Sequence, residues 1–254
     1  ARIRGGLPYR VTSVTPSARG VEVGMEPVGE SLGRHQPGQF AFLTASPEGQ
    51  TETHPFSLTS RSGDTEVTML IRPAGDWTEL LQTGLAVGDE VALSKPFGGF
   101  TPQSGDVAEA PQVWVAAGAG ITPFLSVLRT AEATQGKATE GRSGGGSSVE
   151  LVYIANSPDD APSWEEVTEL ERRLPWLTVH GWHTGEVGRP TPELIRQVID
   201  EAPPESEWYL CGPRPVSAMF AKEIRSATGA SIHQESYQWR ASKAVAPTAA
   251  ASNR

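Results

Sequence analysis

The hydrophobic pattern of the sequence changes near residue 110, and this change divides the chain into two parts. Before it, apolar and polar residues alternate over short runs such as 21–26, which is the period-two pattern of half-buried strands. After it, apolar runs typical of strands alternate with longer stretches that carry helix start signals. A chain of 254 residues is long enough for two hydrophobic cores, so we expect two domains in series.

The first part predicts a small antiparallel β-barrel over residues 1–108. Its closely spaced strand candidates are 21–26, 39–44, 67–71 and 91–93, and a further strand ends at 54–57. One helix is expected here, beginning with Thr78 as its N-cap and ending near Gly84.

The second part predicts an α/β domain with a doubly wound parallel sheet over residues 109–240. Ser163 and Glu166 have the spacing of a capping box, Thr122 and Thr191 each precede a proline, and Gly229 suits the end of the last helix. Residues 241–254 are rich in Ala and Ser, and we expect a disordered tail there. The strands are expected at 113–117, 150–155, 177–182 and 208–211, and the helices at 122–133, 164–174, 192–201 and 215–228.

Composition excludes several classes of function. The chain has 30 acidic and 21 basic residues, for a net charge of −9, which argues against a general nucleic-acid-binding protein. Cys211 is the single cysteine, so neither an intramolecular disulfide nor a cysteine-ligated iron–sulfur cluster is possible. The five histidines show no metal-binding spacing, and no apolar run has the length of a membrane span.

Three segments combine strand ends with residues suited to cofactor binding. Gly118-Ala119-Gly120 opens a helix after a strand, where backbone N–H groups can approach a pyrophosphate. Pro123 stands where the usual dinucleotide motif has its third glycine, so a plain tight turn explains this segment about as well. His54-Pro55-Phe56-Ser57 offers an aromatic ring and a hydroxyl to a flavin, although Phe56 also suits a strand's core face. Gly75-Asp76-Trp77-Thr78 opens a helix beside Arg72 and fits an anion, or else a simple helix cap.

Taken in order, these segments resemble the ferredoxin–NADP reductase superfamily, and specifically the dehydrogenase domain of the ferric reductase and NADPH oxidase family. The resemblance runs from about Tyr9 to Arg240. Besides the three segments above, it rests on Pro37-Gly38-Gln39-Phe40, Pro96-Phe97-Gly98, Gly118–Pro123, Cys211-Gly212-Pro213 and His233-Gln234-Glu235-Ser236-Tyr237.

The resemblance implies FAD bound between the two domains, and NADPH or NADH as the hydride donor. It places Phe56 and Ser57 at the isoalloxazine, with His54 and Pro55 in the same motif. It implies Ser57, Cys211, Glu235 and Tyr237 as the residues at the reacting centre, with Tyr237 covering one flavin face and Trp239 as an alternative. The other residues implied in cofactor binding are Arg72, Gly75, Asp76, Trp77 and Thr78 for the pyrophosphate, and Gly118, Gly120, Thr122, Pro123, Gly212 and Pro213 for the nicotinamide cofactor.

The segment after the second strand of this domain bears on the choice between NADH and NADPH. Relatives that use NADPH often have an arginine there, whereas this chain has Asn156 and Ser157 followed by Asp159 and Asp160. Ser157 could bond a 2′-phosphate, but the two aspartates would repel it. We therefore expect a preference for NADH, unless Arg189 supplies the missing charge.

The function implied is an FAD-dependent NAD(P)H dehydrogenase module that passes electrons from the flavin to a one-electron acceptor. In the family the electrons go to haems in an attached membrane domain, which would put the module on the cytoplasmic side of a membrane. One alternative is a stand-alone, soluble cytoplasmic reductase of flavin, iron chelates or ferredoxin. Another is a non-catalytic flavin-binding redox sensor.

Overall fold

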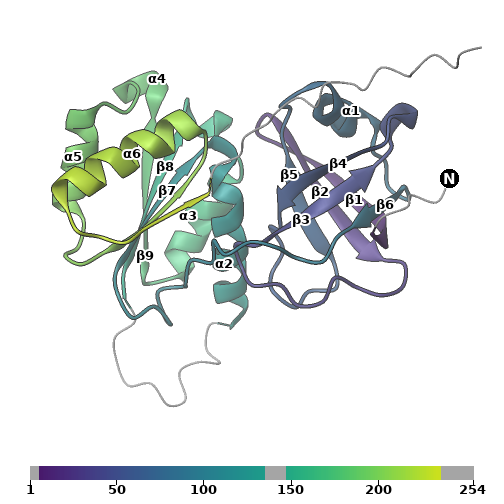
Figure 1. Ribbon diagram of the computed structural model, residues 1–254, viewed down its shortest axis with the longest axis horizontal. Helices are drawn as coiled ribbons and strands as arrows, with labels where there is room; N and C mark the ends of the chain where they lie inside the picture. The colour runs from purple at the N-terminus through teal and green to yellow at the C-terminus, as the bar shows by residue number, and fades with distance from the viewer. Residues whose placement is uncertain (1–5, 135–146, 236–254) are drawn as a thin grey trace, which may run out of the picture.

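The computed structural model describes residues 6–134 and 147–235, and it has the expected two-domain architecture. Figure 1 shows a β-barrel on one side and a parallel sheet covered by helices on the other. The predicted tail at 241–254 and the aromatic residues Tyr237 and Trp239 lie outside the described residues.

The barrel is an antiparallel sheet of six strands in the order β4-β3-β6-β1-β2-β5. An antiparallel bridge between Leu58 and Met69 joins the end of β4 to β5, which closes the sheet. Inward-facing residues such as Tyr9, Met25 and Leu43 fill the interior and are fully buried. The strands are β1 (Leu7–Ser17), β2 (Gly20–Pro27), β3 (Phe40–Ala45), β4 (Glu52–Ser57), β5 (Val67–Ile71) and β6 (Glu90–Leu93).

Helix α1 (Asp76–Gly84) packs against the barrel through Trp77 and Leu81, both buried. Its N-cap lies three residues before the position that we expected. Gly75 occupies the N-cap, and the Thr78 hydroxyl donates to the Gly75 carbonyl from inside the first turn. The prediction of Thr78 as N-cap is therefore wrong, because glycine provides the backbone geometry of the turn and threonine braces it.

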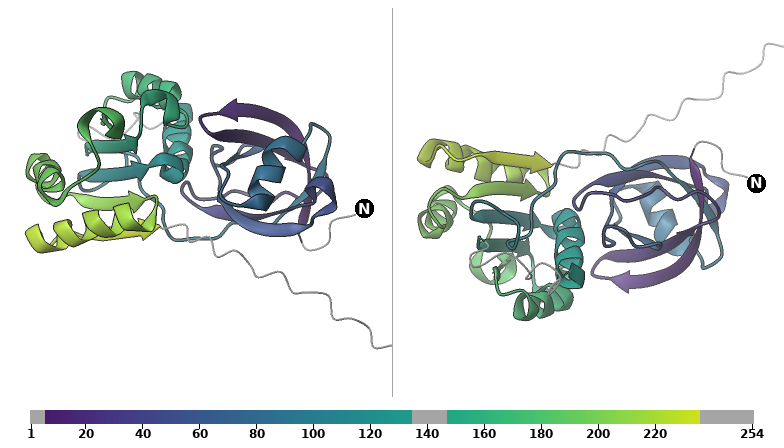
Figure 2. Two further views of the ribbon diagram at one scale, coloured as in Figure 1. Left: turned by 90° about the horizontal axis from the view of Figure 1, so that it is seen from above. Right: turned by 90° about the horizontal axis from the view of Figure 1, so that it is seen from below.

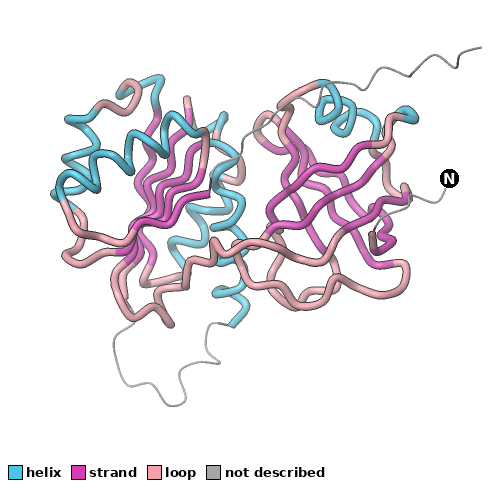
Figure 3. Tube along the Cα trace, in the orientation of Figure 1, coloured by secondary structure: helices cyan, strands magenta, loops and turns pink. Residues whose placement is uncertain are grey.

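The second domain has five parallel strands in the order β11-β10-β7-β8-β9. Each central strand sends alternate side chains to two separate cores, which is why these strands are apolar throughout. Figures 2 and 3 show the strands stacked between helical layers. The strands are β7 (Gln112–Ala117), β8 (Val149–Ala155), β9 (Leu177–His183), β10 (Glu207–Cys211) and β11 (Ile232–Glu235).

Two helices cover each face of this sheet. The core that contains Trp114 and Leu151 is closed by α2 (Thr122–Thr134) and α3 (Trp164–Arg173). The core that contains Val115 and Leu210 is closed by α5 (Pro192–Glu201) and α6 (Arg214–Ala227), and the short α4 (Thr184–Val187) precedes α5. Helix α2 lies between the parallel sheet and the barrel, so it carries contacts between the two domains.

In the second domain, one of the four helix-cap predictions is confirmed and three are wrong. Thr191 caps α5 and accepts a hydrogen bond from the Leu194 N–H. Ser163 has a left-handed backbone and makes no capping bond. Thr122 donates its hydroxyl to the Ala119 carbonyl, because a 3-10 turn at 118–121 already starts the helix. Helix α6 ends with Thr228 as an extended C-cap, so Gly229 is not used in a left-handed turn.

Candidate functional site

A cavity of about 440 Å³ lies between the barrel and the parallel sheet. Its walls come from four segments: the end of β4, the connection from β5 to α1, the turn from β7 to α2, and the turn from β10 to α6. The lining residues are Pro55, Phe56, Ser57, Leu70, Arg72, Pro73, Ala74, Ala117, Gly118, Ala119, Gly120, Thr122, Gly212 and Pro213.

The parallel sheet explains why two of these turns meet. Strands β7 and β10 are neighbours, with Ala116 beside Cys211 at their carboxyl ends. The turns that follow both strands therefore lie at one edge of the sheet, which is where open α/β folds bind ligands. A third wall segment, 55–57, belongs to the barrel strand that ends at the same place.

Glycines let these turns approach closely. A Cβ on Gly120 would lie 2.1 Å from the Cys211 carbonyl oxygen, and one on Gly212 would lie 2.8 Å from the Ala117 Cβ. Gly118 has a φ of +54°, and a Cβ there would lie 2.7 Å from Arg72 Nη1. Any larger residue would close this backbone cradle, which suits the approach of a bulky phosphorylated cofactor.

Arg72 supplies a half-buried cation to the cavity. Within residues 6–134 and 147–235 its guanidinium has neither a hydrogen bond nor an ion pair, and burial lowers its pKa. Its Nη1 instead lies over Gly118 of the other domain. Because a buried cation is stabilised by a nearby negative charge, this arrangement fits the pyrophosphate of a flavin dinucleotide.

Phe56 and Ser57 form the barrel side of the cavity. Phe56 lies opposite Ala41 in the strand register, is 5% exposed and also belongs to the barrel core. Phe56 therefore packs in the barrel core and also forms part of the cavity wall. Ser57 lies next to it in the wall, which is the position that the flavin hypothesis requires. Stacking on the flavin remains a prediction.

His54 and Trp77 stack on each other rather than lining the cavity. Their ring centroids are 4.4 Å apart with planes at 24°, and His54 Nε2 lies 2.7 Å from Glu52 Oε2. Trp77 donates its indole N–H to the Gln50 carbonyl. The pair therefore ties the start of α1 to β4. None of residues 75–78 lines the cavity, and the Thr78 hydroxyl is buried and donates to the Gly75 carbonyl, so the predicted contact of 75–78 with a pyrophosphate would have to come from the backbone.

Cys211 and Glu235 stand beside each other at the ends of β10 and β11. Cys211 is 2% exposed and belongs to the core beneath α2, whereas Gly212 and Pro213 after it line the cavity. The Glu235 Oε2 atom is buried and has no hydrogen-bond partner among residues 6–134 and 147–235, and burial raises the pKa of this carboxyl to about 7.

Replacing Glu235 by glutamine is expected to stabilise the fold above pH 7. Burial raises the Glu235 pKa from 4.5 to about 7, so between these values the folded chain keeps a proton that the unfolded chain releases. Below pH 4.5 the carboxyl is protonated in both the folded and the unfolded chain, and the stabilising effect of this proton is complete. As the pH rises through about 7 the folded chain loses the proton as well, and the free energy of unfolding has then fallen by about 3 kcal/mol. Urea unfolding at pH 5 and pH 8 measures it, and a stability difference between the two proteins that is equal at both values would contradict the prediction.

The residues expected to select the nucleotide form a separate polar cluster at the end of β8. Asp160 accepts hydrogen bonds from Asn156 Nδ2 at 2.8 Å and from Ser157 Oγ at 3.1 Å. Its other oxygen pairs with the Arg19 guanidinium, which extends from the turn between β1 and β2 in the barrel. Ser157, the side chain expected to bond a 2′-phosphate, is thus already bound to a carboxylate, and so is Asn156.

The sequence reasoning missed several wall residues and this cross-domain pair. Leu70, Pro73, Ala74, Ala117 and Ala119 line the cavity, and each lies within two residues of a predicted site residue. Their apolar or small side chains carry no chemical signal of their own. Arg19 had no local signal, because its partner Asp160 is 141 positions away in sequence.

The part of the chain that the structure describes has neither a membrane-spanning helix nor a cluster of metal-binding side chains. None of its helices has the length and apolar character to span a bilayer. Nor do its His, Cys, Asp and Glu side chains form any group of three or more able to hold a metal ion.

Comparison with known families identifies both domains. Residues 28–118 match the model of an FAD-binding domain, and residues 114–222 match the model of an oxidoreductase NAD-binding domain. The propane 2-monooxygenase reductase component of Rhodococcus jostii is 32% identical over 253 residues, which cover 89% of this chain and 62% of that protein. NADH-cytochrome b5 reductase 1 of Ajellomyces capsulatus is 31% identical over 204 residues, covering 74% of this chain and 63% of that protein.

Solved structures share the fold. The flavohaem-like FAD/NAD-binding domain of nitric oxide dioxygenase from Vibrio cholerae has a TM-score of 0.76 at 23% identity, covering 92% of this chain and 99% of that one. A ferredoxin–NADP⁺ reductase from Neisseria gonorrhoeae, solved with FAD and NADP bound, has a TM-score of 0.67 at 18% identity, covering 90% and 97%. This chain spans somewhat less than two thirds of the length of the curated relatives named above.

The family models and the shared fold confirm the resemblance at the level of the superfamily. They do not reach the finer assignment to ferric reductases and NADPH oxidases, which stays a prediction. The two family models together match residues 28–222, and they describe an FAD-binding domain followed by an NAD-binding domain of oxidoreductases. The chain thus combines an FAD-binding domain with an oxidoreductase NAD-binding domain, in the two-domain fold that ferredoxin–NADP reductases share.

Proposed function

We propose that this protein is an electron-transfer reductase that takes hydride from NADH and delivers electrons to a separate redox protein or domain. The observation that carries the proposal is the interdomain cavity, where four sequence-distant segments meet around the half-buried Arg72. The names of the relatives support a reductase that serves a partner, since one is a monooxygenase reductase component and another a cytochrome b5 reductase. They favour this alternative over the attached haem-containing membrane domain that the resemblance first suggested.

We assign different roles in cofactor binding to different residues of the cavity. FAD, when bound, accepts a hydride from nicotinamide C4 at its N5 and releases the electrons singly. Arg72 would neutralise the pyrophosphate, while Phe56 and Ser57 would hold the ring and hydrogen-bond its reactive edge. The turn at 118–122 and the turn at 211–213 would hold the nicotinamide cofactor against it, so the main contribution of the protein is orientation.

Glu235 would serve as a proton reservoir one strand from the nicotinamide turn. At neutral pH its carboxyl is close to half protonated, because burial raises its pKa to about 7. Its register partner Cys211 directly precedes the cavity residue Gly212. This position suits a group that exchanges protons with the reduced cofactor as electrons leave.

Anaerobic mixing of the FAD-loaded chain with NADH tests the proposal. We expect rapid bleaching of the flavin absorbance, followed by reoxidation when ferricyanide, cytochrome c or a [2Fe–2S] ferredoxin is added. Tight binding of FMN without binding of FAD, or no bleaching by either nicotinamide, would contradict the assignment. Reoxidation by free ferric chelates alone would instead favour an iron reductase.

Cys211→Ala is expected to slow flavin reduction by NADH about tenfold while changing the FAD dissociation constant less than twofold. The thiol lies at the end of β10 beside the turn that we assign to the nicotinamide, so its loss should alter the approach of that ring. Stopped-flow reduction and FAD titration provide the two values. If the rate is unchanged and only the melting temperature falls, Cys211 is a packing residue.

A further inference from the structure

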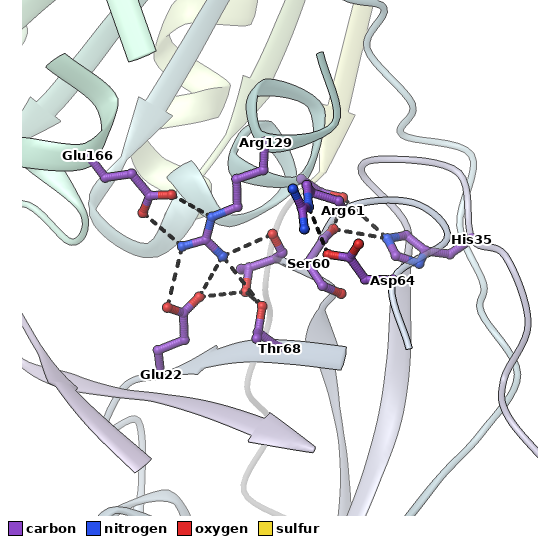
Figure 4. A network of polar contacts seen from close by, with 10 residues as sticks. Glu22, His35, Ser60, Arg61, Asp64, Thr68, Arg129 and Glu166 are labelled. Atoms are coloured by element: carbon purple, nitrogen blue, oxygen red, sulfur yellow. Dashed lines mark hydrogen bonds and ion pairs between the residues drawn. The ribbon is translucent and has the colours of Figure 1, made fainter. Parts of the chain in front are cut away.

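Arg129 of helix α2 joins the two domains through a buried polar network, shown in Figure 4. Its Nη1 lies 2.7 Å from Glu22 Oε1 in β2, and its Nε lies 2.6 Å from Glu166 Oε1 in α3. Nη1 also donates to the Thr59 carbonyl at 3.1 Å. One guanidinium therefore binds a carboxylate from each domain and a backbone carbonyl of the barrel.

The attraction between Arg129 and the carboxylates of the network is strong. The Arg129 side chain is 16% exposed and that of Glu22 is 25% exposed, so water screens their attraction weakly. Burial opposes the charge on Arg129, but the hydrogen bonds that its guanidinium donates to Glu166 and Glu22 outweigh this effect and raise the arginine pKa. Burial likewise raises the pKa of Glu22, and the contacts with Arg129 reverse this and lower it overall. Both groups stay charged across the physiological range.

The network is close in sequence to both walls of the cavity. Thr59 follows the wall residue Ser57 by two positions. Arg129 follows the wall residue Thr122 by seven positions, which is about 10 Å along the same helix. Between these points, the buried Ser126 hydroxyl donates to the Ser60 carbonyl at 2.7 Å. The segment that carries the barrel wall is thus bound twice to the helix that carries the opposite wall.

We propose that Arg129 is a positioning residue for hydride transfer, because its link to Glu22 and Thr59 sets the distance between the flavin wall and the nicotinamide wall. The proposal rests on hydride transfer from nicotinamide to FAD at this cavity, and not on the identity of the final acceptor. A displacement of about 1 Å between reacting groups is enough to slow such a reaction by up to about a hundredfold.

The two carboxylates provide a matched pair of variants. Glu22→Ala removes a carboxylate that reaches Arg129 across the interface, whereas Glu166→Ala removes one from the same domain as Arg129. Both leave Arg129 with a single carboxylate, and Glu22→Ala in addition removes the acceptor of the Thr59 hydroxyl, so the free energy of unfolding of each variant is measured beside its rate of reduction. We expect Glu22→Ala to slow reduction of bound FAD at saturating NADH about tenfold or more, and Glu166→Ala to slow it less than threefold.

The measurements separate positioning from stability and from cofactor binding. Stopped-flow reduction gives the rate constant, titration gives the FAD dissociation constant, and X-ray scattering of the FAD-free chain gives its radius of gyration. We expect the FAD affinity to stay within about twofold for both variants, and the radius of gyration to increase for Glu22→Ala only. Arg129→Met combined with Glu22→Gln and Glu166→Gln, which leaves no uncompensated carboxylate, should reproduce the slow reduction if Glu22→Ala fails to fold.

Equal slowing by Glu22→Ala and Glu166→Ala, or no slowing by either, would overturn the proposal. So would slowing that disappears at high NADH concentration, because that result indicates weaker nicotinamide binding. Arg196→Met serves as an additional control, since Arg196 pairs with the buried Glu223 between α5 and α6, away from the interface. Wild-type protein that is not reduced by NADH at all would refute the proposed function and the role of Arg129 with it, whereas a wild type that is reduced and two variants that behave alike would refute the role of Arg129 alone.

Discussion

Arg72→Met is expected to weaken FAD binding about a hundredfold, which corresponds to about 2.7 kcal/mol. Arg72 reaches from the barrel to Gly118 of the other domain and has no anionic partner within hydrogen-bond distance in the described part of the chain. A bound pyrophosphate would provide that partner in a partly desolvated site, where charge-assisted hydrogen bonds are strongest. Methionine preserves the apolar stem and removes the charge. Fluorescence titration of the FAD-free protein gives the dissociation constant.

Arg10→Met is the matched control for this experiment. Arg10 also belongs to the barrel, but its side chain is 55% exposed, and its Nη2 lies 3.9 Å from Glu90 Oε1 on the outer surface. Its removal should leave FAD affinity unchanged, because exposed ion pairs contribute little. The assignment of Arg72 to the pyrophosphate is wrong if both variants bind FAD as tightly as the wild type. If Arg72→Met weakens NADH binding alone, the cation serves the nicotinamide cofactor instead.

The general architecture could be predicted because its signals are local. Alternation of apolar residues in 21–26 and 67–71 gave two barrel strands, and unbroken apolar runs such as 113–117 gave strands of the parallel sheet. Strands β1 and β11 were missed for a physical reason. Pro8 and Pro16 lie next to the two ends of β1, and β11 is a short edge strand with a single apolar residue, so neither shows a clear period.

Part of the site could be predicted for the same reason, because glycine turns and strand ends are visible in sequence. Ser57, Gly118, Gly120, Gly212 and Pro213 all line the cavity. The ring of Trp77 could not be placed in this way, since the same motif is compatible with a side chain in the barrel core, where the structure puts it. The contacts between domains could not be predicted either. Arg129 and Glu22 are 107 positions apart, and only the folded topology brings them together.

Asp160→Asn is expected to raise the preference for NADPH relative to NADH about thirtyfold, or about 2 kcal/mol in the ratio of kcat/KM. In the wild type, the Asp160 carboxylate binds Asn156, Ser157 and Arg19 and places a negative charge at the end of β8. Our assignment of Asn156 and Ser157 to the adenosine end of the cofactor puts a 2′-phosphate beside this charge. Asparagine keeps the size of the side chain, removes the repulsion and releases the Arg19 guanidinium to bind the phosphate.

Asp159→Asn controls for the change in net charge, because Asp159 precedes Asp160 in the same 3-10 turn and is exposed. We expect it to alter the ratio less than threefold, because charge at this distance is screened by water and salt. Steady-state kinetics with both nucleotides, at equal ionic strength, gives the four values of kcat/KM that are needed. Equal effects of the two variants would mean that net charge alone selects the nucleotide. A loss of NADH efficiency with no gain for NADPH would mean that Asp160 only braces the loop after β8. The prediction is supported only if the efficiency with NADPH rises in Asp160→Asn and not in Asp159→Asn. That result would mean that the Asp160 carboxylate excludes the 2′-phosphate by binding the donor groups that the phosphate would use.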